Sequence, residues 1–262
     1  MNLSNLSKKI KSLNSNLDGI SDDLVSTLKD YQREYESLLR SKAFDLSDGK
    51  LKSTIKHYNA AQSINPMSKL GFNTIALDQV KTYPQIVKDQ LAFNASIGIS
   101  TDITFKDVEI LERLQKLDFS IFQTEAKLLD ERIKRELVNA IALEMPYQQT
   151  VDNLSKSMLG AGGKTGSLAG FSNTYMRTAL FSLSKAVDQE IYDDLGIDKY
   201  IYAGPIDAKT RPFCAARIGK TFTTEQINKF GSLNGSGLNG FLMPGGWNCR
   251  HRMIPEEVIE ED

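Results

Sequence analysis

The dominant pattern in this chain is helical, because apolar residues recur every three or four positions through most of the first 195 residues. At the start the apolar series is Leu3, Leu6, Ile10, Leu13, Leu17, Ile20, Leu24, Leu28, Tyr31, Tyr35 and Leu38. Two consecutive steps of four around Leu24 would interrupt a continuous seam. We therefore expect a break at Asp18-Gly19, with Ser21 capping a second helix. This segment is predicted to be a helical hairpin or arm that packs on its own protein or on a partner chain.

Similar spacing predicts further helices along the chain. Leu51, Ile55 and Tyr58 share one face of a helix expected near residues 51–64. The later apolar positions are Val108, Leu111, Leu114, Leu117, Leu129, Ile133, Leu137, Ile141, Val151, Leu154, Met158, Met176, Leu180, Leu183, Val187 and Ile191. The first eight of these indicate either one long helix or two helices separated near Asp118.

The pattern changes after Gly196, where short runs rich in β-branched and aromatic residues replace the helical spacing. Residues 199–203, 220–223 and 251–255 are predicted strands. The sequence therefore predicts an α+β fold: a mainly α-helical body with a small C-terminal α+β cap that contains a short antiparallel sheet. By segment, we expect an N-terminal helical arm or body over 1–105, a second helical part over 106–195, the cap over 196–256 and an acidic tail over 257–262.

Charge is balanced over the whole chain but not within it. The 262 residues include 32 basic and 33 acidic ones, so no overall positive charge draws the chain to nucleic acid. Residues 207–252 nevertheless hold seven basic and two acidic residues, and residues 256–262 hold five acidic ones. This basic segment could contact DNA or an acidic protein surface, or the tail could neutralise it. The candidate contact residues are Lys209, Arg211, Arg217 and Arg250.

Targeting signals and nucleotide-binding motifs are not supported. No apolar run approaches the length of a membrane span or a signal peptide, which predicts synthesis in a reducing cytoplasm. Gly-Lys-Thr at 163–165 lacks the first glycine of a P-loop, since Met158 stands there and a helix precedes it. Residues 235–240 match GxGxxG without a surrounding βαβ unit. Both glycine-rich stretches are predicted loops.

Both cysteines and one of the two histidines fall in the last fifty residues. Cys214, Cys249 and His251 supply three of the four ligands that a structural zinc ion requires, and Asp207 is a candidate fourth. Two buried free thiols beside a hydrogen-bonded histidine, or a disulfide, are the alternatives. A nucleophilic Cys214–His251 pair is disfavoured, because no orienting group is evident. His57 is expected to be structural or solvated.

The order of short motifs around these residues is distinctive. Along the chain it runs Tyr200-Ile201-Tyr202-Ala203-Gly204-Pro205-Ile206-Asp207, Thr210-Arg211-Pro212-Phe213-Cys214, Gly219-Lys220-Thr221-Phe222-Thr223 and Pro244-Gly245-Gly246-Trp247-Asn248-Cys249-Arg250-His251. With the helix-rich segment before it, this order resembles the phage Mu F-like minor head protein family over residues 145–256. The first hundred residues carry little of that pattern.

The resemblance implies a structural, non-enzymatic head morphogenesis protein of a tailed phage. Such a protein is made in the host cytoplasm and becomes a minor virion component at the portal vertex of the head. Its expected partners are the portal and capsid proteins, with phage DNA as a further candidate and oligomers formed through the long helices as another.

Many members of that family carry a four-ligand zinc site, and this chain departs from it. Arg211 stands where the first cysteine would be, Gly246 replaces a histidine, and His251 replaces the last cysteine. The resemblance thus leaves Cys214, Cys249 and His251 as zinc ligands. The rival functions are a metal-dependent hydrolase or nuclease that uses these three residues, and a non-specific DNA-binding module that uses the basic ones.

Overall fold

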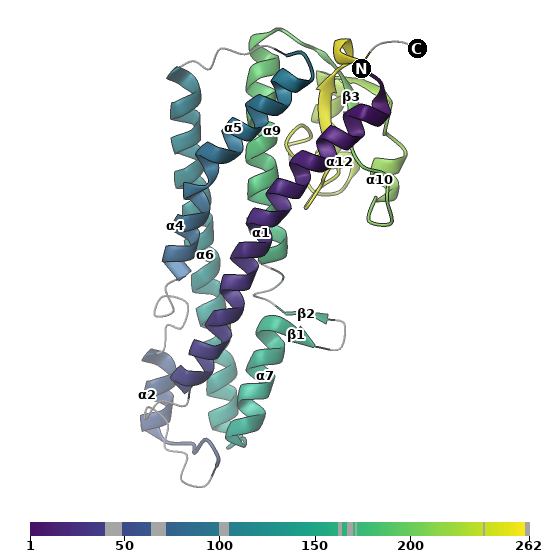
Figure 1. The fold of residues 1–262 in the computed structure, drawn as a ribbon. Helices are drawn as coiled ribbons and strands as arrows, with labels where there is room; N and C mark the ends of the chain where they lie inside the picture. Colours follow the sequence, from purple (N-terminus) through teal and green to yellow (C-terminus); the bar gives the residue numbers. More distant parts are fainter. Residues whose placement is uncertain are drawn as a thin grey trace. The chain divides into compact units, whose positions relative to one another are not determined.

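The fold is that of a computed structural model, which describes residues 1–39, 49–63, 72–99, 105–161, 164–166, 170, 172–237 and 239–259 (Figure 1). Helices dominate these ranges and a small antiparallel sheet lies near the C-terminal end, which confirms the predicted α+β class. Across the same ranges, no helix combines the length and apolar character needed to cross a membrane. The chain divides into two compact units, each assembled from segments that are far apart in the sequence.

Unit 2 comprises Asp22–Val80 and Lys116–Ser172. Its elements include all or part of α1 (Leu3–Leu39), α2 (Ile55–Ser63), α4 (Phe72–Lys81), α6 (Phe105–Ala142), α7 (Tyr147–Leu159), β1 (Gly160–Ala161) and β2 (Lys164–Thr165). Strands β1 and β2 pair as a short antiparallel hairpin where the sequence predicted only a loop. The core of this unit is formed by apolar side chains such as Phe122, Leu129, Ile133, Leu137 and Leu154.

The helix expected near 51–64 is present as α2, but it begins only at Ile55, so Leu51 lies before it and does not share its face. Ile55 is 79% exposed, and the residues that α2 buries are His57 and Ala61. His57 Nδ1 lies 2.7 Å from the carbonyl oxygen of Lys52, so this histidine has a structural hydrogen bond. Apolar spacing did not indicate this face, because a buried histidine carries no apolar signal.

Two long helices run without the predicted interruptions. Helix α1 is continuous from Leu3 to Leu39, so the expected break at Asp18-Gly19 is wrong. A glycine inside a helix costs only about 1 kcal/mol relative to alanine, and burial of Leu6, Ile10 and Leu17 offsets that cost. Of the two readings of the later apolar series, the single helix is correct, since α6 spans Phe105–Ala142.

Unit 1 comprises Met1–Ser21, Lys81–Gln115 and Asn173–Asp262. Besides parts of α1 and α6, its elements are α5 (Tyr83–Ser96), the π-helical turn η1 (Ser172–Met176), α9 (Arg177–Asp194), β3 (Lys199–Ala203), α10 (Pro212–Ala215), β4 (Thr221–Thr223), α11 (Thr224–Asn228), α12 (Phe230–Leu233), β5 (Arg252–Pro255) and the 3-10 turn η2 (Glu256–Val258). Helices α5 and α9 lie side by side within it (Figure 1). Helix α5 was not predicted from the apolar spacing, although Pro84 in its first turn is a common helix-start residue.

The three strands form one antiparallel sheet in the order β4-β3-β5. Central strand β3 pairs Tyr200 with Phe222 of β4 and Tyr202 with Met253 of β5. All three predicted strands are therefore present, with bounds shifted by a residue or less. Behind the sheet, the rings of Tyr200 and Phe241 meet edge to face at 5.3 Å between centroids. This aromatic core fixes the strand ends from which the candidate site is built.

Candidate metal centre

The structure brings Cys214, Cys249 and His251 together inside unit 1. Cys214 lies in the short helix α10, and the other two residues immediately precede strand β5. All three side chains are buried, and their sulfur and nitrogen atoms lie within 4.8 Å of one another. These residues are 35 and two positions apart along the chain, so only the folded cap assembles them.

The imidazole of His251 is oriented by a backbone contact. Its Nε2 atom lies 3.0 Å from the carbonyl oxygen of Pro205, which assigns the ring proton to Nε2. The other ring nitrogen, Nδ1, lies 3.8 Å from Cys249 Sγ, and in the neutral imidazole it is the atom available to a metal ion. The ring sits against the backbone of Gly204, where a Cβ atom would lie 2.6 Å from His251 Cδ2. Glycine at this position therefore permits the ring orientation that points Nδ1 at the thiols.

A second glycine makes room for the two sulfur atoms. The backbone N–H of Gly245 donates to Cys249 Sγ at 3.2 Å. A Cβ atom on Gly245 would lie 2.4 Å from Cys214 Sγ and 2.8 Å from Cys249 Sγ, so no larger residue fits. Backbone N–H groups that donate to a sulfur stabilise its thiolate form.

The two thiols differ in their readiness to lose a proton. The pKa of Cys214 is raised, chiefly because its thiol is hydrogen-bonded to Cys249 and also because it is buried. Burial alone would raise the pKa of Cys249, but the Cys214 thiol and His251 lower it well below its usual value. Cys249 is therefore the thiolate of the pair and Cys214 the thiol that donates to it. A thiolate and a neutral imidazole are the forms that bind metal ions.

A buried ammonium group lies beside this thiolate. Lys185 of α9 donates from Nζ to the carbonyl oxygen of Cys249 at 2.6 Å. Burial lowers the pKa of Lys185 to about 8, while the nearby charge of Cys249 opposes that effect. The amine thereby ties helix α9 to the ligand segment and partly compensates its negative charge.

A polar network lies next to the site and joins β5 to helices α5 and α9. Arg252 donates to the Asp188 carboxylate at 2.9 Å, to Gln90 Oε1 at 2.8 Å and to Ser184 Oγ at 2.8 Å. Asp188 also accepts from Asn94 Nδ2 at 3.0 Å. Burial raises the pKa of the Asp188 carboxyl to about 6, and the Arg252 guanidinium opposes the rise. Because Arg252 follows His251 directly, this network holds the ligand segment against the helices.

Asp207, the fourth ligand suggested by the sequence, is not brought into the cluster. It lies on an exposed loop after β3, where Arg250 donates to both of its carboxylate oxygens at 2.6 and 2.7 Å. The hydrogen bonds from Arg250 hold the pKa of Asp207 well below its usual range. This ion pair closes the loop over the site from the outside without contributing a ligand.

The candidate contact residues for DNA have other partners within the chain. Arg211 donates to the carbonyl oxygens of Gly245 and Trp247, which anchors the loop that carries the second glycine. The Arg217 guanidinium lies 3.6 Å from the centre of the Phe213 ring. Lys209 is exposed, and its backbone N–H bonds to Asp207. The arginines therefore hold the cap together as much as they present positive charge.

The donor set fits a zinc ion. From a Zn–S distance of about 2.3 Å and a Zn–N distance of about 2.0–2.1 Å, tetrahedral geometry requires S···N separations near ~3.6 Å. The observed 3.8 Å between Cys249 Sγ and His251 Nδ1 is close to that value. The imidazole N–H bonded to Pro205 and the N–H···S contact from Gly245 are the kind of outer contacts that orient metal ligands. The three residues can therefore hold a metal ion.

Comparison of the chain with models of known protein families, with curated proteins and with solved structures found no match. The class of the protein therefore rests on its residues and their geometry alone: a mainly helical α+β protein whose C-terminal cap encloses a buried Cys/His cluster.

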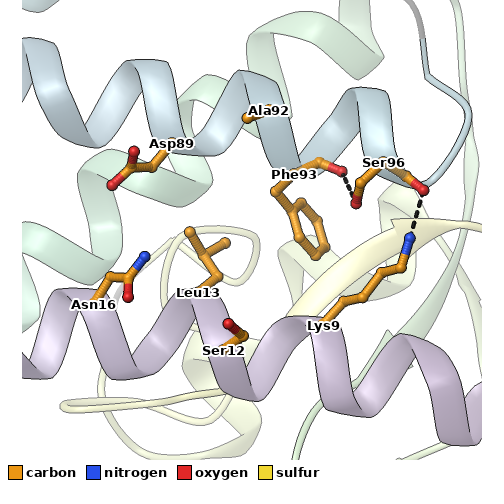
Figure 2. A pocket seen from close by; sticks show the side chains of 8 residues that line it. All are labelled: Lys9, Ser12, Leu13, Asn16, Asp89, Ala92, Phe93 and Ser96. Atoms are coloured by element: carbon orange, nitrogen blue, oxygen red, sulfur yellow. Dashed lines mark hydrogen bonds between the residues drawn. The ribbon is translucent and has the colours of Figure 1, made fainter.

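A crevice lies between α1 and α5 in unit 1 (Figure 2). Its lining residues are Lys9, Ser12, Leu13, Asn16, Asp89, Ala92, Phe93 and Ser96. The Lys9 amine donates to the carbonyl oxygen of Ser96 at 2.6 Å, and Asp89 accepts from Gln85 at 2.7 Å. Both charged groups are thus already bonded to the chain, and the crevice presents no convergent donor set.

Sequence reasoning missed Tyr202, Gly245, Lys185 and Asp188. Lys185 and Asp188 lie at helical spacing between Phe181 and Tyr192 on α9, so two charged residues aligned with two aromatic ones were a readable signal for a buried network. Gly245 belongs to a Gly-Gly pair just before the second cysteine, which indicated a close backbone approach. For Tyr202 there was no such signal, since an aromatic residue in a strand is ordinarily core.

Proposed function

We propose that this chain is a structural minor head protein of a tailed phage, which associates with the portal vertex during head assembly. The proposal begins from the sequence resemblance, since its motifs lie in the cap described above. The observation that carries it is that these motifs, spread over about fifty residues, are bonded to one another in space. Pro205 accepts from His251, and Asp207 pairs with Arg250. The Tyr202 N–H donates to the carbonyl oxygen of Lys220 at 3.0 Å. Motif residues that meet in this way support a shared structural role rather than chance similarity.

We propose in addition that the cluster of Cys214, Cys249 and His251 binds a structural zinc ion. When bound, zinc supplies a rigid cross-link between α10 and the segment before β5, and it favours the folded cap over the unfolded chain. Two residues of the chain position the ligands: Gly245 leaves room for the sulfur atoms, and the Pro205 carbonyl orients the histidine.

A protein partner is favoured over DNA by the state of the basic residues. Arg211, Arg217 and Arg250 all bind groups of the chain itself, and a phosphate contact would have to compete with those bonds. Phosphate binding requires free, exposed cationic side chains. The apolar stripe on the first half of α1 is not available to a partner either, because it is buried in unit 1. Portal and capsid proteins would therefore meet other exposed surfaces of the chain.

The proposal is tested by deleting the gene from the phage that carries it. We expect fewer complete heads by electron microscopy and a loss of infectivity, both restored by the wild-type chain supplied in trans. Pull-down of the tagged chain from infected cells should recover the portal protein. Unchanged head assembly and infectivity after deletion would overturn the proposed role.

A matched pair of variants connects the role to the cap. His251→Ala removes the cluster histidine in unit 1, whereas His57→Ala removes a buried histidine of unit 2 that is bonded to Lys52. His251→Ala should impair complementation in zinc-replete medium, and His57→Ala should retain it if the protein accumulates to wild-type levels. Equal complementation by both variants would mean that head assembly does not require the histidine of the cap.

A further inference from the structure

The proposed zinc site has three identified ligands, and a structural zinc ion takes four. Cys214, Cys249 and His251 come from the sequence and meet in the fold. Asp207 is held on the surface by Arg250 and does not join them. The fourth donor must therefore be another buried atom beside the sulfur atoms, or else a water molecule.

The side-chain hydroxyl of Tyr202 is in that place. Tyr202 lies on β3, the central strand of the sheet, and it is completely buried. Its Oη atom lies 3.8 Å from Cys249 Sγ, the same separation as between that sulfur and His251 Nδ1. The Tyr202 and His251 rings also pack together at 5.4 Å between centroids, and each ring has a polar atom beside Cys249 Sγ.

The backbone of Gly245 shows that Tyr202 Oη lies on the same side as the two sulfur atoms. A Cβ atom on Gly245 would lie 2.4 Å from Cys214 Sγ, 2.8 Å from Cys249 Sγ and 3.2 Å from Tyr202 Oη. Three donor atoms from three separate elements thus pack against one residue. Zn–S and Zn–O distances of about 2.3 and 2.0–2.2 Å give tetrahedral S···O separations near ~3.5 Å, close to the 3.8 Å observed for Tyr202 and Cys249.

We propose that the hydroxyl oxygen of Tyr202 is the fourth ligand of the metal ion held by Cys214, Cys249 and His251. This inference rests on the metal centre of the proposed function and specifies its ligand set as two sulfur atoms, one nitrogen and one oxygen. Such a set is closed by the protein on all four sides. A closed site leaves no position for the water molecule that a zinc hydrolase or nuclease activates, so the inference also favours a structural role over an enzymatic one.

The test compares two substitutions that each remove one hydroxyl from the same strand. Tyr202→Phe removes the proposed ligand and keeps the ring that packs on His251. Tyr200→Phe is the control, because the Tyr200 hydroxyl bonds to the carbonyl oxygen of Ile197. The full chain is purified, stripped of metal and titrated with zinc against a chromogenic chelator, while the ultraviolet difference spectrum of tyrosine is recorded.

We expect wild type and Tyr200→Phe to bind zinc with the same affinity and to show the difference band of a coordinated tyrosine. Tyr202→Phe should bind at least about tenfold more weakly and lack that band, since even outer partners of a metal ligand contribute about 10–100-fold. Unchanged affinity in Tyr202→Phe would overturn the inference. So would a wild-type titration with no tyrosine band, which would reduce Tyr202 to a hydrogen-bond donor.

Failure of the inference is distinguishable from failure of the proposed function. If the wild type binds zinc and Tyr202→Phe binds it equally well, the metal centre stands and only the fourth ligand is wrong. If the wild type takes up no zinc, the metal centre itself is wrong and this inference falls with it. Head assembly after gene deletion is a separate measurement that neither result determines.

Discussion

Two buried polar clusters lie in unit 1, and they differ in the kinds of atom that they bring together. Around Asp188 and Arg252, nitrogen and oxygen donors face oxygen acceptors in hydrogen bonds of 2.5–3.0 Å, and within the described part of the chain the Nε atom of Arg252 is left without one. Around Cys249, the polar neighbours meet a sulfur atom: Tyr202 Oη and His251 Nδ1 each lie 3.8 Å from Cys249 Sγ, and both are atoms that can also bind a metal ion. Lys185 joins the two clusters through the carbonyl oxygen of Cys249.

The difference separates a structural network from a candidate ligand site. A buried thiolate is costly, so a cation beside it is stabilising. The Asp188 network contains its own cation, the guanidinium of Arg252. The cysteine cluster has only the distant compensation of Lys185, and a metal ion would complete it.

The largest effect on stability is expected from breaking the Asp188–Arg252 network. Asp188→Ala leaves the buried guanidinium of Arg252 without its carboxylate, which should lower the free energy of unfolding by about 3–5 kcal/mol. Urea denaturation at neutral pH measures this loss. Asp193→Ala, on the exposed side of the same helix, should change stability by no more than about 0.5 kcal/mol. A loss below about 1 kcal/mol in Asp188→Ala would mean that the network does not hold unit 1 together.

The second largest effect on stability is expected from placing a methyl group against the two sulfur atoms. Gly245→Ala places a methyl group 2.4 Å from Cys214 Sγ, which should cost about 1–3 kcal/mol from overpacking and abolish zinc binding. Zinc titration and thermal unfolding report the two losses separately. Gly19→Ala is the matched control, since nothing lies within 4 Å of its added methyl group. Zinc binding that survives Gly245→Ala would place the metal elsewhere.

Zinc itself should stabilise the cap in proportion to its binding. At a free zinc concentration 100 times the Kd, the free energy of unfolding should rise by about 2.7 kcal/mol. His251→Ala should lose most of this increment, whereas His57→Ala should keep it despite its own lower stability. The measurement is chemical denaturation of each protein with zinc and with a chelator. The same increment in His251→Ala would exclude the histidine as a ligand.

The smallest effect concerns Asp207, which belongs to neither cluster. Its pKa is lowered by Arg250, so the ion pair contributes stability above pH about 4 that is lost as the pH falls through the lowered value. Because the carboxylate is 40% exposed, that contribution is below about 1 kcal/mol. Asp207→Asn should remove this acid-sensitive contribution to the free energy of unfolding and leave zinc affinity unchanged. Weaker zinc binding in Asp207→Asn would return Asp207 to the ligand set.

The parts of the fold that local chemistry determines were predictable from the sequence. The strands at 199–203, 220–223 and 251–255 follow from β-branched and aromatic runs bounded by turn residues, and all three are present. The continuity of α1 through Gly19 was not predictable, because burial of a distant apolar stripe decides whether one unfavourable residue ends a helix. Helix α5 was missed for a similar reason, since Gln90 and Asn94 interrupt its apolar face and are explained only by Asp188 of α9.

The sequence predicted the three Cys and His ligands of the candidate site, but not the other residues that surround them. Two cysteines and a histidine in one short cap indicated a shared metal, and the fold brings them together. Asp207 was suggested because it is a carboxylate nearby in sequence, whereas the bidentate contact with Arg250 depends on the path of the loop. Tyr202 enters the site through strand register, which no residue pattern encodes, whereas the Gly245-Gly246 pair before Cys249 indicated a close backbone approach without saying what approaches it.

Elemental analysis of the full chain, purified without chelators, tests the central claim most directly. The account predicts one zinc ion per chain, with Cys214 and Cys249 protected from thiol reagents until a chelator removes the metal. Protein that contains no metal, takes up none on titration and shows two thiols that react without chelator would contradict it.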